Sequence, residues 1–396
     1  MPTSRSPVAA PRISTDVRGG VRLAVEGVQG VVDIVESMHQ RIASLAPPLG
    51  TVPDRRTSGI TGFVYRRVRG TTRLVGSGLD LALAAAERLV PGATQRGDAP
   101  QRDAVVAALN GICGDHLHRT GNPLAVTMEL RPAAGATPSP HLLVLVHGLC
   151  MTGSQWDHRG HDHGMALGDA LKATPVYASY NSGRHIAVNG AELAGRISEL
   201  VASWPVPVAS VTLIGHSMGG LVARSAVARA SGSGMPWAKL LRAMVFLGTP
   251  HHGAPLERGG NWVHRALGVS PYVAPFARLA GLRSEGITDL RHGNLHGAGT
   301  ESRFAPGHVP AAVPLPVGVA CYAIAGSLRP APLGDGLVTV ASALGRAESP
   351  ERDLALPANR VRVIEDCGHL DLLHHPEAFG QMRQWLVGER APNQLL

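Results

Sequence analysis

The sequence predicts an α/β fold with a mostly parallel central sheet and helices on its flanks. Short apolar stretches rich in β-branched residues recur after about residue 125, at 141–146, 208–214, 317–325 and 360–365. They alternate with segments of helix formers and small residues, at 220–230 and 376–387. Because strands that alternate with helices form βαβ units, we expect most strands to be parallel.

Residues 1–125 predict a helical extension before the sheet. Apolar residues recur at helical spacing in 21–45, 60–90 and 103–118, and proline-rich stretches separate these segments. Their apolar faces can be covered by the rest of the chain or a second subunit, or by reversible contact with a membrane surface. Four arginines between 66 and 73 suit the membrane alternative. We favour packing, because basic residues do not line the helices along their full length.

The first strand of the sheet is expected near residues 125–130, and the second covers 141–146 (HLLVLV). The second strand leads directly into His147 and Gly148, which in isolation would read as a strand-ending turn. Cys150 follows in the same loop. It lacks the strand–turn–helix setting of a nucleophile, so we interpret it as a small buried side chain.

A histidine cluster, His158, His161 and His163, lies with Asp162 in the polar segment WDHRGHDHG. Zinc binds histidine, but a closed zinc site needs four ligands in tetrahedral geometry. We therefore favour local hydrogen bonding, or a position at a pocket rim, over a metal site. No metal or other cofactor is expected.

The most informative motif is Gly215-His216-Ser217-Met218-Gly219, the one G-x-S-x-G of the chain. A predicted buried strand precedes it and a helix-forming segment follows it. The flanking glycines have a physical task, since side chains two residues either side of the serine would collide with the adjoining strand and helix. This context predicts Ser217 as a nucleophile presented on a strained turn.

A long insertion between residues 250 and 316 contains enough apolar residues for two short amphipathic helices. The next predicted strand, 317–325, leads into a loop that contains GDGLV, and Asp335 stands past the strand end. That is the place of an acid that orients a catalytic imidazole. Asp-Gly is also a common turn dipeptide, so this signal alone is weak.

Among 19 histidines, the best general base is His369, in the loop between the last predicted strand and the C-terminal helix. His374 and His375 are alternatives, but they stand at the start of that helix. Asp366 is an alternative acid; only three residues from His369, it would need an unusually tight loop. We favour Asp335 with His369.

With these motifs the chain resembles bacterial lipases and esterases, including triacylglycerol-lipase-like proteins. The matching pieces lie within about residues 126–390 and are VHGL, GHSMGG, LGTPHHG, GDGLV and GHLD. The resemblance implies an α/β-hydrolase fold with a catalytic triad of Ser217, Asp335 and His369. It also implies an oxyanion hole built from the backbone amides of Leu149 and Met218, and a cap or lid at about 252–310.

Some lipases of this group bind a structural calcium through an aspartate placed like Asp371 and a second aspartate upstream of the triad acid. Residues 302–334 contain no acidic side chain. Because calcium prefers several anionic oxygen ligands, we expect no calcium site.

Composition predicts a cytoplasmic protein. The N-terminal segment has no apolar signal region, and no apolar run reaches the ~18–20 residues that cross a bilayer. The 4 cysteines have no C-x-x-C spacing, as expected for reduced thiols. The net charge of +8 comes from arginines dispersed among acids, so nucleic-acid binding is not expected.

These observations predict a serine hydrolase that acts on small-molecule or lipid esters. Two alternatives remain open. An acyltransferase would use the same triad with an acceptor other than water, and a binding protein of the same fold would lack catalysis. The presence of all three triad candidates disfavours the binding protein.

Overall fold

The computed structural model describes residues 18–25, 29, 67, 69–71, 77, 100–253, 284–295, 313–328 and 334–388. The chain divides into two compact units. Unit 1 comprises Met1–Arg102, His116–Ala125 and Pro271–Leu282, and unit 2 comprises Asp103–Asp115, Val126–Ser270 and Arg283–Leu396. All the residues expected in the active site lie in unit 2.

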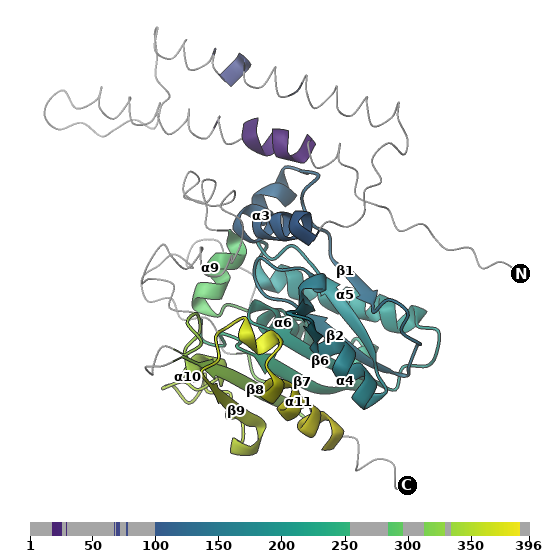
Figure 1. Cartoon of the computed structure of the whole chain (residues 1–396). Coiled ribbons are helices and arrows are strands. Elements are labelled where there is room, and N and C mark those ends of the chain that lie inside the picture. The colour runs from purple at the N-terminus through teal and green to yellow at the C-terminus, as the bar shows by residue number, and fades with distance from the viewer. Residues whose placement is uncertain are drawn as a thin grey trace, which may run out of the picture. The chain divides into compact units, whose positions relative to one another are not determined.

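A seven-stranded sheet in the order β1-β5-β2-β6-β7-β8-β9 forms the centre of unit 2 (Figure 1). The strands are β1 (Glu129–Pro132), β2 (His141–Val146), β5 (Thr174–Ser179), β6 (Ser210–His216), β7 (Leu241–Leu247), β8 (Ala320–Ser327) and β9 (Val361–Glu365). Strand β1 pairs with β5 in the antiparallel sense, and all the other neighbours are parallel. The predicted mostly parallel sheet is confirmed.

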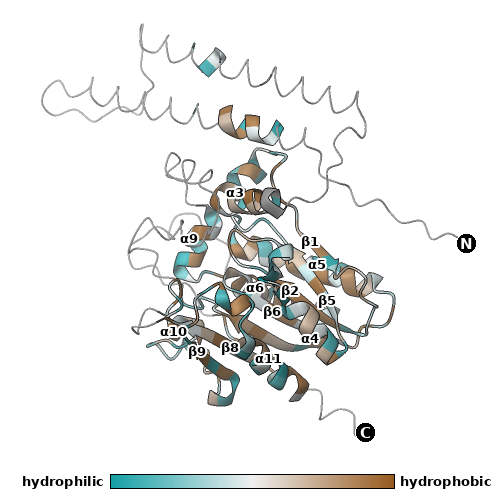
Figure 2. Ribbon diagram, viewed as in Figure 1, coloured by the Kyte–Doolittle hydropathy of each residue, from teal (hydrophilic) through white to brown (hydrophobic). Residues whose placement is uncertain are grey.

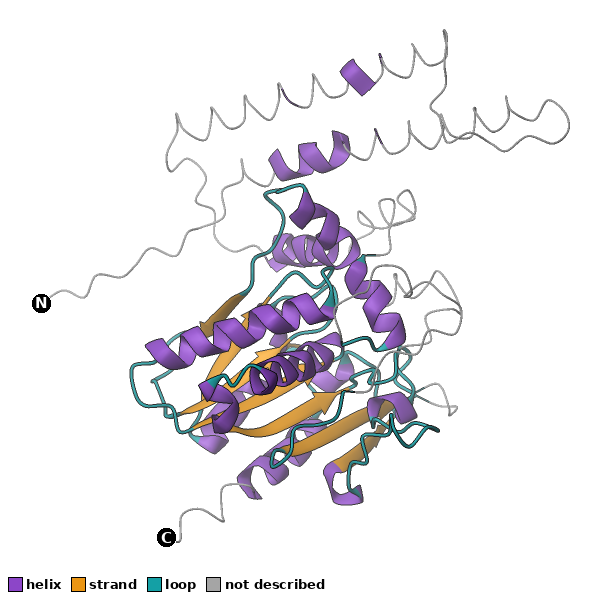
Figure 3. Cartoon of the chain, turned by 180° about the vertical axis from the view of Figure 1, so that it is seen from behind, coloured by secondary structure: helices purple, strands orange, loops and turns teal. Residues whose placement is uncertain are grey.

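Helices cover both faces of this sheet. They are α4 (His163–Leu171), α5 (Ile186–Ser203), α6 (Met218–Gly232) and α11 (Pro376–Gly388). Helices α5 and α6 pack on each other on one face, and α4 and α11 pack on each other on the other (Figures 1 and 3). Burial on both faces explains why the central strands are continuous apolar runs rather than alternating ones. Figure 2 shows these strands as the most hydrophobic part of the molecule.

The sequence located the middle of each strand better than its ends. The strand expected near 125–130 begins at Glu129, because the amide of Val126 donates to Asn110 Oδ1 at 2.9 Å and is tied to a helix instead. The strand expected at 317–325 begins at Ala320, since Gly318 lies in a turn with φ +77°. Both shifts come from residues that hold the backbone in non-strand geometry.

The helix expected at 103–118 is confirmed as α3 (Pro100–Arg119). Its residues 103–115 pack tightly within unit 2. A Cβ on Gly111 would collide with the Cys150 side chain and lie 3.0 Å from Cys150 Cα. A Cβ on Gly114 would collide with the Asn181 side chain. These two glycines let α3 approach the loops that follow β2 and β5.

The remaining described elements are the short strands β3 (Asp157–His158) and β4 (His161–Asp162) and the helices α9 (Glu285–His292) and α10 (Val340–Ala343). Four single 3₁₀ turns complete the set: η1 (Gly153–Trp156), η2 (Pro236–Leu240), η3 (Ala358–Arg360) and η4 (Asp371–Leu373).

Most of the predicted extension and cap lies outside the described residues. Of 21–45 and 60–90, the structure describes 21–25 and the single positions or short pieces 29, 67, 69–71 and 77, all helical. Of the cap at about 252–310, it describes 252–253 and 284–295, which contain α9. Within the described ranges, no helix has both the length and the apolar character needed to cross a bilayer.

Candidate active site

Ser217 lies at the sharp turn between β6 and α6. Its backbone has φ 54° and ψ −125°, a conformation that is costly for a residue with a side chain. The Ser217 amide donates to Leu247 O at 2.8 Å, and the Ser217 carbonyl accepts from Gly220 N at 3.1 Å. Hydrogen bonds from both sides therefore hold the strained residue in place.

The two glycines that flank the serine are required by backbone contacts. A Cβ on Gly219 would collide with the carbonyl oxygens of Val146 and His147. A Cβ on Gly215 would lie 2.7 Å from the carbonyl carbon of Gly219. No side-chain rotation relieves these clashes, because the atoms involved are backbone. This is the steric role that the sequence analysis gave to both glycines.

The structure brings Asp335 and His369 together. His369 Nδ1 lies 2.7 Å from Asp335 Oδ2, and both side chains are buried, with 7% and 3% of their surface exposed. Asp335 Oδ1 accepts from the amides of Leu337 (3.0 Å) and Val338 (2.8 Å). A carboxylate on Nδ1–H leaves Nε2 of the neutral imidazole free to accept a proton, as a general base requires.

The alternative acid and bases occupy other positions. Asp366 is exposed, with φ 53°. His374 Nε2 lies 3.4 Å from a guanidinium nitrogen of Arg159, and His375 Nδ1 accepts from the Glu377 amide at 3.2 Å. The thiol of Cys150 is buried, which raises its pKa to about 12 and keeps it protonated at neutral pH.

His216, the neighbour of Ser217, connects the nucleophile turn to the His369 loop. His216 Nε2 donates to the carbonyl of His369 at 3.0 Å, and the two rings are 4.8 Å apart at their centroids. Burial lowers the pKa of His216 well below its usual value, so the ring is neutral. Within the described residues no hydrogen bond joins Ser217 Oγ to His369, a contact that in many enzymes tightens only when substrate binds.

The loop after β2 lies against the nucleophile. A Cβ on Gly148 would lie 3.1 Å from Ser217 Cβ. His147 is stacked on Tyr180, with ring centroids 4.3 Å apart, and Tyr180 donates from its hydroxyl to His147 O (2.8 Å) and from its amide to His147 Nε2 (3.3 Å). Burial lowers the pKa of His147 to about 4, so its Nε2 can accept. Tyr180 therefore holds the start of this loop.

The two predicted oxyanion donors are the backbone amides of Leu149 and Met218, which directly follow Gly148 and Ser217 in the sequence. The amide of Cys150, next in the loop, donates to Ser182 Oγ at 3.0 Å. Among the described residues, the amides of Leu149 and Met218 do not donate a hydrogen bond to a side chain or to a loop carbonyl. Both remain available to an anionic oxygen near Ser217.

Gly248 has a role that the sequence analysis did not assign. It follows β7 with φ +56°, and a Cβ there would lie 3.0 Å from Asp335 Oδ2 and 3.2 Å from His369 Cε1. The backbone of residue 248 thus forms one wall of the acid–base pair. The LGTPHHG motif contained this glycine, but no spacing in the sequence connects it to Asp335.

The histidine cluster makes local hydrogen bonds. His163 Nε2 donates to Leu372 O at 2.9 Å, so its Nδ1 accepts from His161 Nε2 at 2.9 Å. Asp162 caps α4 by accepting from the Met165 amide at 3.1 Å. Among the described residues, no group of three or more side chains is arranged to hold a metal ion.

Asp371, which the resemblance placed at a calcium site, is engaged by protein donors. Its Oδ2 accepts from the Gly368 amide at 3.0 Å, and its Oδ1 lies 3.5 Å from the Arg159 guanidinium. Together with the His163 contact to Leu372, these bonds tie the His369 loop to the β3–β4 hairpin. The aspartate therefore has a structural role in holding this loop.

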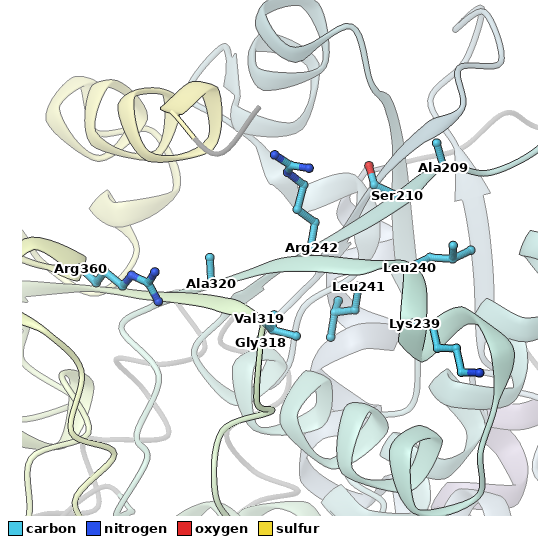
Figure 4. Close-up of a pocket in the computed structure, with 10 residues that line it drawn as sticks. All are labelled: Ala209, Ser210, Lys239, Leu240, Leu241, Arg242, Gly318, Val319, Ala320 and Arg360. Atoms are coloured by element: carbon cyan, nitrogen blue, oxygen red, sulfur yellow. The ribbon is translucent and has the colours of Figure 1, made fainter. Parts of the chain in front are cut away.

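A cavity of about 550 Å³ opens at the other end of the sheet, where β7 and β8 begin (Figure 4). Its lining includes the cations Lys239, Arg242 and Arg360. Figure 4 shows Arg242 and Lys239 extending in opposite directions, so their charges do not converge. Ser217, Asp335 and His369 follow the carboxyl ends of the strands, and this cavity is not part of their site.

Part of the chain is similar to a known protein family. Residues 177–270 match the family model described as PGAP1-like alpha/beta domain. No curated protein sequence matches the chain.

Solved structures of lipases and esterases are similar to the chain. Mature lipase BlEst2 of Bacillus licheniformis is 18% identical, with a TM-score of 0.43 over 65% of this chain and 97% of that chain. Esterase Pf2001 of Pyrococcus furiosus is 15% identical, with a TM-score of 0.39 over 63% and 82%. Lipase B of Aspergillus fumigatus is 18% identical, with a TM-score of 0.38 over 67% and 57%. With its strand order and with Ser217, Asp335 and His369 after β6, β8 and β9, the chain has the α/β-hydrolase fold and is similar to lipases and esterases.

Proposed function

We propose that this protein is a serine hydrolase that cleaves carboxylic esters of small molecules or lipids. The observation that supports it most is the buried His369–Asp335 pair, 2.7 Å apart, on the loops beside the strained Ser217 turn. Ser217, Asp335 and His369 come from three distant parts of the sequence. Nucleophilic catalysis through an acyl-enzyme explains all three.

In the proposed mechanism, His369 Nε2 takes the Ser217 proton as the hydroxyl oxygen attacks the ester carbonyl. The oxyanion that forms accepts hydrogen bonds from the amides of Leu149 and Met218. The tetrahedral intermediate collapses and expels the alcohol, which receives the proton from His369. Water then attacks the acyl-enzyme in the same way and releases the acid, while Asp335 stabilises each imidazolium.

The test is labelling by a fluorescent organophosphonate together with hydrolysis of short- and medium-chain p-nitrophenyl esters. The wild-type protein should be labelled on Ser217 and release p-nitrophenol, and Ser217→Ala should do neither. Ser231→Ala is the matched control, because Ser231 is exposed on the same helix. Labelling that persists in Ser217→Ala would place the nucleophile elsewhere.

The same assay separates hydrolysis from acyl transfer. An acceptor alcohol is added at increasing concentration, and the acid and the new ester are measured by mass spectrometry. We expect the acid as the main product. A new ester that dominates at millimolar acceptor would assign the triad to an acyltransferase.

A further inference from the structure

A second cavity, of about 350 Å³, lies in unit 2 beside helix α6. Its volume is within the range of small-molecule sites. The lining comes from five separate parts of the chain: Arg224 of α6, His251 and His252 after β7, Gly293 and Leu295 after α9, and residues 313–315 and 351–354. Arg224 lies two helical turns beyond Ser217, about 10 Å along the helix axis, so the cavity is distinct from the nucleophile turn.

Arg224 is a buried cation without an anionic partner. Its side chain is 5% exposed, and it donates to Val313 O and, at 3.1 Å, to His251 Nδ1. Its Nε has no hydrogen-bond partner, and no carboxylate of the described residues pairs with it. Burial lowers the pKa of Arg224 only to about 10, so the guanidinium stays charged at neutral pH.

The charge of Arg224 is not balanced by its neighbours. The Cys321 thiol, which acts electrostatically on Arg224, has a pKa raised to about 12 and is neutral. Burial also lowers the pKa of His251 well below its usual value, so that ring is neutral too. A buried charge is costly unless it is paired, and one donor of Arg224 remains unused. An anion in the cavity would pair with this charge and accept a hydrogen bond from the guanidinium.

His251 offers a second unused donor. Because the guanidinium of Arg224 donates to His251 Nδ1, the ring proton must be on Nε2. His251 Nε2 is buried and has no partner. The ring is held edge-on against Phe246, with centroids 4.8 Å apart at 90°. Two side chains of the lining, Arg224 and His251, therefore each have a nitrogen without a hydrogen-bond partner among the described residues.

The rest of the lining combines apolar side chains with His252, Glu351, Arg352 and Asp353. The apolar side chains are those of Leu295, Val313, Pro314, Leu315 and Leu354. Glu351 is exposed, and the Asp353 carboxylate accepts from the amides of Ala347 (3.2 Å) and Ala355 (2.6 Å). These acids are occupied or solvated, and they do not neutralise Arg224.

We propose that this cavity binds an aliphatic carboxylate, with its carboxylate group at the Arg224 guanidinium and its hydrocarbon chain against the apolar side chains of the lining. A planar carboxylate matches the planar guanidinium, and Arg favours such bidentate partners. Phosphate fits less well, because its further charge and oxygens would face apolar side chains. The site is independent of the proposed ester hydrolysis.

The test measures binding of decanoate, decanol and inorganic phosphate by isothermal titration. Decanoate should bind at one site per chain, with decanol and phosphate at least tenfold weaker. Arg224→Met should weaken decanoate binding at least tenfold. Arg229→Met, which removes an exposed arginine of the same helix, should change it less than twofold. Equal affinity for decanol, preference for phosphate, or unchanged binding in folded Arg224→Met would overturn the proposal.

A second measurement uses the unaltered protein, in case Arg224→Met does not fold. Decanoate that carries a diazirine at its chain end is photolysed with the wild-type protein, and the labelled peptides are identified by mass spectrometry. Labels should fall in 291–295, 313–315 or 351–354, and excess decanoate should suppress them. Labels confined to the loops around Gly148 and His369 would place the acid in the active site instead and overturn the assignment.

Discussion

The carboxylate of Asp335 makes three hydrogen bonds, and Asp335→Asn would remove the most important one. An amide can accept from Leu337 and Val338, but it favours the wrong tautomer of His369. We expect kcat for an aryl ester to fall by roughly 10³- to 10⁴-fold with the fold retained. Asp366→Asn should leave kcat within a few-fold. The reverse pattern would transfer the acid role to Asp366.

Gly248→Ala tests the wall of the acid–base pair. The substitution puts a Cβ 3.0 Å from Asp335 Oδ2 in a backbone with φ +56°, and positive φ alone costs about 1–2 kcal/mol. We expect kcat to fall at least tenfold. Gly318→Ala is the matched control, because Gly318 has φ +77° with nothing within 4 Å of the added Cβ. Equal kcat in the two variants would show that only backbone strain matters.

The sequence identified Ser217, Asp335 and His369 as candidates because each stands past the end of an apolar strand, in a recognisable order. It did not identify Gly248, His216 or Tyr180 as supports of the site. Their roles arise where the segments that follow β2, β5, β6, β7, β8 and β9 meet in space. Such contacts between distant segments depend on strand order, which local spacing does not reveal.

Helix α3 supports the predicted oxyanion loop through the close approach of Gly111 to Cys150. Gly111→Ala would force a backbone-level shift, since the added Cβ lies 3.0 Å from both Cys150 Cα and Cys150 N. We expect a lower melting temperature together with lower kcat, measured by calorimetry and ester hydrolysis. Gly195→Ala in α5, where nothing lies within 4 Å, should instead stabilise the protein by up to about 1 kcal/mol. Unchanged kcat in Gly111→Ala would separate α3 from the oxyanion loop.

The strands of the sheet were predictable because helices cover both of its faces. Strands buried on both faces are continuous apolar runs, which are easy to recognise in the sequence. The short β3–β4 hairpin was not, since two-residue strands have no periodicity. The segment 126–128 was misassigned because Asn110, in a helix, binds the Val126 amide and competes with strand pairing. The spacing of apolar residues cannot show which side chains bind backbone groups of another element.

Stability should fall in mild acid because the fold buries neutral histidines. Burial lowers the pKa of His147 and His163 to about 4 and lowers the pKa of His216 and His251 well below the usual value. The unfolded chain protonates these residues below about pH 6.5, so the stabilisation is complete above that pH and is lost as pH falls from 6.5 towards 4.

Urea unfolding at pH 7, 6 and 5 measures this effect. Between pH 6 and 5, unfolding should take up close to four protons. The free energy of unfolding should therefore fall by about 5 kcal/mol per pH unit at most. An uptake of fewer than one proton on unfolding would mean that these histidines are not buried in their neutral form.

The division of the chain predicts what a shortened protein retains. We propose that residues 1–125 form an accessory extension and that the cap spans about 252–310. Within the extension, however, residues 103–115 of α3 belong to unit 2 and contact the Cys150 loop. A chain that starts at Gln101 keeps this helix and every candidate catalytic residue. We therefore expect it to retain esterase turnover per folded molecule.

The same shortened chain should melt earlier or aggregate, because the apolar stripes of 21–45 and 60–90 need a covering surface that the deletion exposes. Co-sedimentation with anionic vesicles at physiological salt separates the two ways of covering those stripes. If the stripes pack on protein, neither the full chain nor the shortened one pellets with vesicles. If the full chain pellets and the shortened one does not, the extension binds membranes, and the four arginines between 66 and 73 become the first positions to substitute.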